Sequence, residues 1–192
     1  MPIPRLDEET AEPQTLDEIR EWWSGVKDAL NEQRVAVLHA IQTGAPPAQR
    51  FVAMTPDEVN GYYEAQKVEL DRLTMLNYVA SAEATVKVYY FRRVGGIGGK
   101  WRDPVSKVLR DWYKKLSGRK QRQPDFDRDG ILDIFKNARA VSNHVIGQFR
   151  ECLQLRHWVA HGRFWEKPAV ADRLDAEDVY ARATTLIQAL PV

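Results

Sequence analysis

Arg156 and His161 stand in the stretch LRHWVAHGRFW, residues 155–165, and their side chains suit acid–base chemistry on an anion. An imidazole titrates near neutral pH, so it can accept a proton in one step and donate it in another. A guanidinium stays charged, and its fork of N–H donors can hold negative charge that develops in a transition state. These two residues are therefore the first candidates for catalysis.

His157 and His161 are four residues apart, so on a continuous helix they share a face and could hold a metal ion. No glutamate lies between them and no third ligand is in view, so we expect no metal site. The one cysteine, Cys152, lies among apolar residues in a helical pattern, which is typical of a packed thiol.

The stretch DFDRDGILDIF, residues 125–135, matches part of the pattern of a calcium-binding loop. The matching residues are Asp125, Asp127, Asp129, Gly130 and Asp133. The twelfth position of such a loop needs a bidentate carboxylate, but here it is Lys136, whose ammonium group would repel the ion. Two interpretations stay open, a cation site and an acidic turn that caps the following helix, and the sequence favours the acidic turn.

Basic residues are concentrated in residues 92–122, which contain eleven bases and two acids, whereas residues 1–32 contain nine acids and three bases. A concentrated basic surface is what binding to a phosphate backbone requires, so we predict contact with a polyanion. The expected contact residues are Arg92, Arg93, Lys100, Arg102, Lys107, Arg110, Lys114 and Lys115. The same segment includes GGIGG, residues 95–99, which lacks the flanking elements of a phosphate-binding loop and is predicted to be a hinge or loop.

The composition is that of a globular protein, with 44% hydrophobic and 29% charged residues in 192. This length suffices for one compact domain with its own core, so we expect a single domain over residues 1–192. No stretch approaches the roughly 20 apolar residues that a membrane helix needs, and the start, MPIPRLDEE, does not look like a signal peptide. We therefore expect a cytoplasmic protein without membrane contact.

Helix start and stop signals divide the chain into the elements that must position these residues. Thr15 followed by Glu18 forms a capping box, in which side chains accept hydrogen bonds from the free N–H groups of the first helical turn. Five helices are predicted, over residues 15–43, 56–93, 103–118 and 129–160, with a short last one that starts at Asp175. No segment alternates like a strand, so the expected fold is an all-α, up-and-down helical bundle.

Arg156 and His161 lie at the end of the predicted fourth helix, and helical geometry separates them. Five residues correspond to about 500° of rotation, so the two side chains point roughly 140° apart. A regular helix therefore cannot make them a tight pair. Two alternatives remain: the helix loosens at His161 and Gly162, or the residues meet across a dimer in which each chain supplies one motif.

The segment RHWVAH, residues 156–161, resembles the R-x4-6-H motif of HEPN domains, including their preference for Asn, His or Lys directly after the arginine. HEPN domains are helical bundles with this motif near the end of a long penultimate helix, followed by a connection and a short last helix, a pattern similar to that of residues 130–190. LNYVASAEATVKVYYF carries Glu83 where related domains often have a polar residue that faces the site. The resemblance covers residues 56–190, with an acidic helical extension over residues 1–50.

The resemblance implies a metal-independent endoribonuclease without a cofactor, whose composite site is formed by two motifs, commonly in a homodimer. Arg156 and His161 would be catalytic, with Glu83 as an orienting group and the basic segment, together with Arg163, as the RNA contact. Cleavage would leave a 2′,3′-cyclic phosphate and a 5′-hydroxyl, and DNA would not be cut because it lacks the 2′-hydroxyl.

The resemblance also bears on partners. HEPN toxins paired with a nucleotidyltransferase antitoxin often have a tyrosine two residues after the histidine, and here that residue is Arg163, which argues against this pairing. A role in phage defence or as a toxin is expected, with another antitoxin or defence-system partner left open. The alternative is a non-catalytic HEPN-like module that binds RNA or protein through its surface.

Overall fold

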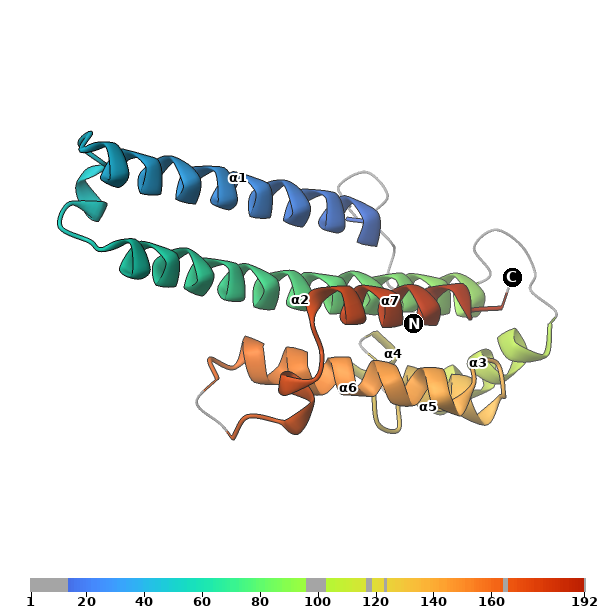
Figure 1. Cartoon of the computed structure of the whole chain (residues 1–192). Helices are drawn as coiled ribbons and strands as arrows, with labels where there is room; N and C mark the ends of the chain where they lie inside the picture. Colours follow the sequence, from blue (N-terminus) through green and yellow to red (C-terminus); the bar gives the residue numbers. More distant parts are fainter. Residues whose placement is uncertain (1–13, 96–102, 117–118, 123, 164–165, 192) are drawn as a thin grey trace.

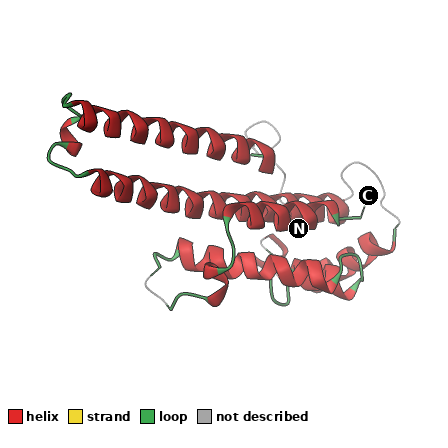
Figure 2. Cartoon of the chain, viewed as in Figure 1, coloured by secondary structure: helices red, strands yellow, loops and turns green. Residues whose placement is uncertain are grey.

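The computed structural model describes residues 14–95, 103–116, 119–122, 124–163 and 166–191. Within these ranges the regular elements are helices and no strand occurs, which confirms the expected all-α class (Figure 2). The helices are α1 (Leu16–Thr43), α2 (Pro56–Gly95), α3 (Pro104–Lys115), α4 (Arg119–Arg122), α5 (Ile131–Asn137), α6 (Asn143–Ala160) and α7 (Ala176–Gln188). Two 3₁₀ turns, η1 (Gln49–Phe51) and η2 (Ala169–Asp172), lie between them.

α1 and α2 form a long antiparallel hairpin (Figure 1). The predicted capping box opens α1: the Thr15 hydroxyl accepts from the Glu18 N–H at 3.2 Å, and Glu18 accepts from the Thr15 N–H at 2.8 Å. α1 ends where predicted, at Gly44, whose φ of 71° is the left-handed conformation that glycine adopts without strain. The far end of the hairpin has a small core of its own around Phe51, Val59 and Tyr63.

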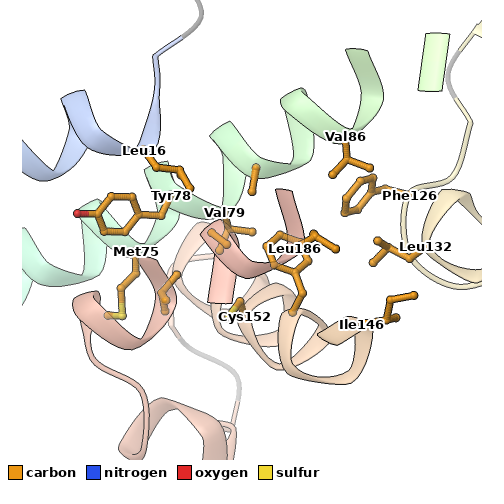
Figure 3. Packing of buried hydrophobic residues seen from close by; sticks show 14 of the residues in the cluster. Leu16, Met75, Tyr78, Val79, Val86, Phe126, Leu132, Ile146, Cys152 and Leu186 are labelled. Atoms are coloured by element: carbon orange, nitrogen blue, oxygen red, sulfur yellow. The ribbon is translucent and has the colours of Figure 1, made fainter. Parts of the chain in front are cut away.

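The main core lies where α2, α6 and α7 meet, with α3 and α5 closing one end. Figure 3 shows Val79 and Val86 of α2, Cys152 of α6 and Leu186 of α7 pointing into it. Leu16, in the first turn of α1, belongs to the same core, so the start of α1 packs on it. One face of α6 packs into this core, so the side chains on the other face of α6 lie toward solvent.

The predicted fourth helix, residues 129–160, is wrong as one element, because α5 and α6 are separated by a turn over residues 138–142. α5 ends at Asn137, Arg139 in the turn adopts φ 53°, and the N–H of Ala140 bonds back to the Phe135 carbonyl at 2.9 Å. Ser142 then caps α6 by accepting from the Val145 N–H at 3.3 Å. The sequence does not reveal this helix end, because the left-handed position that glycine usually occupies is an arginine here.

Candidate functional site

The solvent side of α6 borders an open cleft of about 890 Å³. α2 lines it, together with the turn before α5 and the segment that follows α6. The charged and titratable residues of its lining are Glu83, Asp127, Arg128, Arg156, His157 and Glu166. Arg156 and Glu83, which lie 73 positions apart in the chain, therefore border the same space.

Arg156 is half-buried, and its Nε is buried without a hydrogen-bond partner. Within the described ranges no acid lies at ion-pair distance from its guanidinium. Its neighbour Arg150, on the same helix, contrasts with it, because Asp127 holds Arg150 at 2.6 Å and Asp133 at 2.8 Å. Arg156 thus has no ion-pair partner among the described residues, while Glu83, Asp127 and Glu166 line the same cleft.

His161 is exposed at the end of α6, which is regular up to Ala160. Gly162, at φ 81°, takes the left-handed position that ends the helix, and the Arg163 N–H returns to the Trp158 carbonyl at 3.2 Å. Of the two alternatives for bringing the motif together, loosening of the helix is not observed between Arg156 and His161. The chain leaves the helical path only after His161.

The imidazole rings of His157 and His161 lie 4.3 Å apart between centroids, tilted by 54°. His161 therefore packs on His157, and within the described residues no hydrogen bond or cation–π contact joins His161 to Arg156. His157 lines the cleft together with Arg156. The order along the surface is thus Arg156, His157 and His161, with His161 farthest along the helix.

Glu83 lies on α2 and faces the cleft, with 17% of its side chain exposed. The Lys87 ammonium, one turn further along α2, donates to its carboxylate at 2.5 Å. Glu83 thus borders the same cleft as Arg156, and an orienting role for it stays a prediction.

Arg163 does not belong to a free basic surface. Its guanidinium donates two hydrogen bonds to Glu69 of α2, at 2.6 and 2.9 Å. These bonds lower the pKa of Glu69 and raise that of Arg163. The pairing argues against the predicted RNA-binding role, because the charge is already compensated and the side chain instead ties the end of α6 to α2.

Arg93 departs further from its predicted role in RNA binding, because it is only 3% exposed. Its guanidinium donates to Asp103 at 2.8 Å, to Ser106 at 3.2 Å and to the Pro191 carbonyl at 2.7 Å. Arg93 therefore joins α2 to α3 and to the C-terminal segment. The sequence could not distinguish this buried arginine from its exposed neighbour Arg92.

The exposed basic surface comprises Arg92 at the end of α2 and Lys107, Lys114 and Lys115 on α3. Half-buried Arg110 donates to the Arg93 carbonyl at 3.5 Å. Lys100, Arg102 and residues 96–99 of the glycine-rich segment lie outside the described ranges.

Helical geometry separates this basic surface from the cleft. Arg92 follows Glu83 by nine residues, which corresponds to about 14 Å along α2 and roughly half a turn around it. α3 packs beside the same end of α2, with its own contacts to α5. The basic surface and the cleft are therefore distinct features.

The acidic stretch 125–133 is a turn that leads into α5, as the sequence favoured. Asp127 and Asp133 form ion pairs with Arg150, and Asp125 forms one with Lys120 at 3.0 Å. In the part of the chain that the structure describes, no three His, Cys, Asp or Glu side chains form a group suited to a metal.

The structure explains why residue 130, in this turn, is a glycine. A Cβ at this position would lie 2.1 Å from the Asp125 carbonyl oxygen. The following N–H, of Ile131, bonds to that same oxygen at 2.9 Å, so the two backbone segments cannot separate without losing the bond.

Sequence reasoning missed Arg128 and Glu166 as parts of the cleft, and it considered Asp127 only as a calcium ligand. These residues meet α6 through tertiary packing, which leaves no periodic signal in the chain. Among the described residues no helix combines the length and apolar character that a membrane crossing requires.

Comparison of the chain with models of known protein families, with curated proteins and with solved structures found no match in any of the three. A functional assignment therefore depends on the residues of the motif and on the geometry of the cleft.

Proposed function

We propose that the chain is a metal-independent endoribonuclease of the HEPN type, with Arg156 as the phosphate-binding residue and His161 as the proton-transferring residue. The observation that carries the proposal is the guanidinium of Arg156, which is half-buried beside a cleft, makes no ion pair within the described residues and is followed by exposed imidazoles. A guanidinium without an acidic partner can bind a phosphodiester in its fork. The four-residue spacer and the helical fold agree with the resemblance of the motif.

The proposed site is composite, with Arg156 of one copy and His161 of a second copy. The regular helix up to Ala160 keeps the two side chains roughly 140° apart in one copy. His161 stands exposed at the helix end, where it can approach a second chain. A two-fold symmetric dimer would then contain two equivalent sites.

In the proposed reaction a general base removes the proton of the ribose 2′-hydroxyl, and the 2′-oxygen attacks the adjacent phosphorus. The bond from phosphorus to the 5′-oxygen breaks, and a general acid donates a proton to the leaving oxygen. Arg156 stabilises the extra negative charge on the phosphoryl oxygens. The products are a 2′,3′-cyclic phosphate and a 5′-hydroxyl, with Glu83 of α2 as an orienting group in the cleft.

The test is cleavage of an end-labelled single-stranded RNA in EDTA by the wild type, Arg156→Ala and His161→Ala. Each substitution is expected to lower the rate by about 100-fold or more, the usual loss of a transition-state donor or a general acid–base. Matched controls are Arg139→Ala, in the turn before α6, and His144→Ala, in its first turn, since both side chains are exposed and distant in the chain from the motif. Cleavage that survives in Arg156→Ala and His161→Ala would refute the assignment.

The second candidate is a non-catalytic RNA-binding module, favoured by the exposed lysines of α3, which are separate from the cleft. Binding of RNA that falls with salt, without cleavage by any variant, would support it. A cytoplasmic location, a role as a toxin or in phage defence, and an antitoxin or defence-system partner stay predictions from the resemblance.

A further inference from the structure

We propose that a second copy of the chain docks on the part of the α1–α2 hairpin that extends beyond α6. The docking surface is the side of the hairpin that carries Val35, Gly61 and Val68, named here the open face. The choice of a second copy rests on the proposed function, because the shared site needs another chain beside the motif.

The open face is the uncovered end of a stripe on α2 that is buried further along the helix. Gly61, Val68, Met75 and Ala82 recur every seven residues, so they lie on one side of α2. Met75 and Ala82 belong to the main core and are 7% and 0% exposed. Val68 is 46% exposed, and Gly61 is exposed as well. The side of α2 that packs on the core therefore continues past it without a cover.

The cover of this stripe stops at the end of α6. The helix ends at Ala160, and the hairpin extends past it (Figure 1). Arg163, which follows the helix, donates two hydrogen bonds to Glu69, the residue after Val68. The uncovered stripe thus begins beside the end of α6, where His161 is exposed.

α1 contributes Val35, which is 59% exposed, to the same side of the hairpin. Arg34 donates to the Asn60 side chain at 3.1 Å, and this bond marks where the two helices face each other. Val35 and Gly61 each follow one of these residues, so both are rotated by about 100° in the same sense. In an antiparallel pair, a two-fold axis between the helices makes equal rotations lead to the same side. Val35 therefore lies beside the stripe of α2.

The charged side chains next to Val68 are paired within the chain. Lys67 donates to Glu64 at 2.9 Å, and Glu69 is held by Arg163. Such pairs leave no uncompensated charge that would oppose contact with an apolar surface. Exposed apolar side chains bordered by satisfied polar groups are typical of a protein–protein interface.

A second copy is the occupant that the motif requires. Arg156 and His161 point roughly 140° apart on the regular helix, so a shared site needs another chain at the end of α6. A chain docked on the open face lies at that end. In a two-fold arrangement the open faces of both copies meet, and each copy brings its own α6 end to the other.

Sedimentation velocity of the full-length chain over a concentration series would test the surface. Val68→Glu and Val35→Glu are each expected to raise the dissociation constant of the dimer at least about tenfold, because two-fold symmetry buries two unpaired carboxylates. Leu73→Glu is the matched control and is expected to dimerise like the wild type. Leu73 is 45% exposed on the same helix but lies roughly 140° around it from Val68.

A monomeric wild type would overturn the proposal, as would a dimer that dissociates in Leu73→Glu but not in Val68→Glu. Circular dichroism of each variant establishes that the fold is retained. The same proteins in the RNA assay separate this surface from the nuclease. Cleavage lost in Val68→Glu and Val35→Glu alone, with the motif intact, would support both. Dissociation in these two variants without cleavage by any protein would support the surface and count against the nuclease.

Discussion

Mixing two inactive variants would test whether the catalytic pair is shared between two copies of the chain. Arg156→Ala and His161→Ala are each expected to be inactive alone. In a mixed dimer, one site combines the two alanines and the other combines intact Arg156 from one copy with intact His161 from its partner. The mixture should therefore recover activity that neither variant has.

The expected recovery follows from the symmetry of the dimer. Random pairing gives one half mixed dimers, and each has one intact site of two, so the mixture should reach about one quarter of the wild-type rate per chain. If one copy supplied both residues, every dimer would lack one of them at each site and the rate would stay at the level of the separate variants. The helix, regular up to Ala160, favours the shared site because it holds Arg156 and His161 on different faces.

The assay uses the labelled RNA in EDTA, after the two variants have been unfolded and refolded together. Two different affinity tags quantify the mixed dimers, so the rate can be expressed per mixed dimer. The matched control mixes Arg156→Ala with the double variant that lacks both Arg156 and His161, a pairing that contains no intact site. Mixed dimers without any recovered cleavage would refute the two-copy site.

Three further predictions concern the stability of the fold and its basic surface. Gly130→Ala should lower the free energy of unfolding by about 3 kcal/mol or more, measured by urea denaturation, because the new Cβ meets the Asp125 carbonyl oxygen at 2.1 Å. The hydrogen bond from Arg150 lowers the pKa of Asp133, so the stability that this ionised carboxylate contributes is present above its unfolded-state pKa of about 4 and is lost as pH falls through the lower folded-state pKa; Asp133→Asn should flatten the acid side of the stability curve. Lys114→Ala, at a side chain that is 74% exposed, should reduce the slope of log K for single-stranded RNA against log salt by about 0.7 and leave stability unchanged.

The sequence predicts those parts of the fold that depend on neighbouring residues. Thr15 with Glu18 and Gly44 mark the ends of α1 correctly because a cap is a contact within one turn. The division between α5 and α6 is missed because Arg139 takes a conformation that its side chain does not reveal. Local patterns therefore determine most helix ends, but not an end whose conformation is fixed by tertiary packing.

The candidate site was harder to predict because it depends on distant partners. Arg163 and Arg93 look like surface cations in the sequence, yet Glu69 and Asp103 neutralise them in the fold. The cleft itself joins α2, α6 and the turn before α5, which no spacing rule connects. Only the contact between His157 and His161 follows from the sequence, since residues four apart at a helix end lie on one face.

The lack of an ion-pair or hydrogen-bond partner for the Arg156 Nε is the strongest physical reason to expect a ligand in this cleft. Several arginines of the fold are matched to acids, including Arg150, Arg163 and Arg182. Leaving a buried donor without an acceptor costs about 1–3 kcal/mol, and more when the group is charged. The Arg156 Nε carries that cost in the free protein. A phosphodiester in the cleft would be attracted by the charge of the guanidinium, and it would also supply the missing acceptor once the side chain turns to expose Nε, which is buried in the free protein.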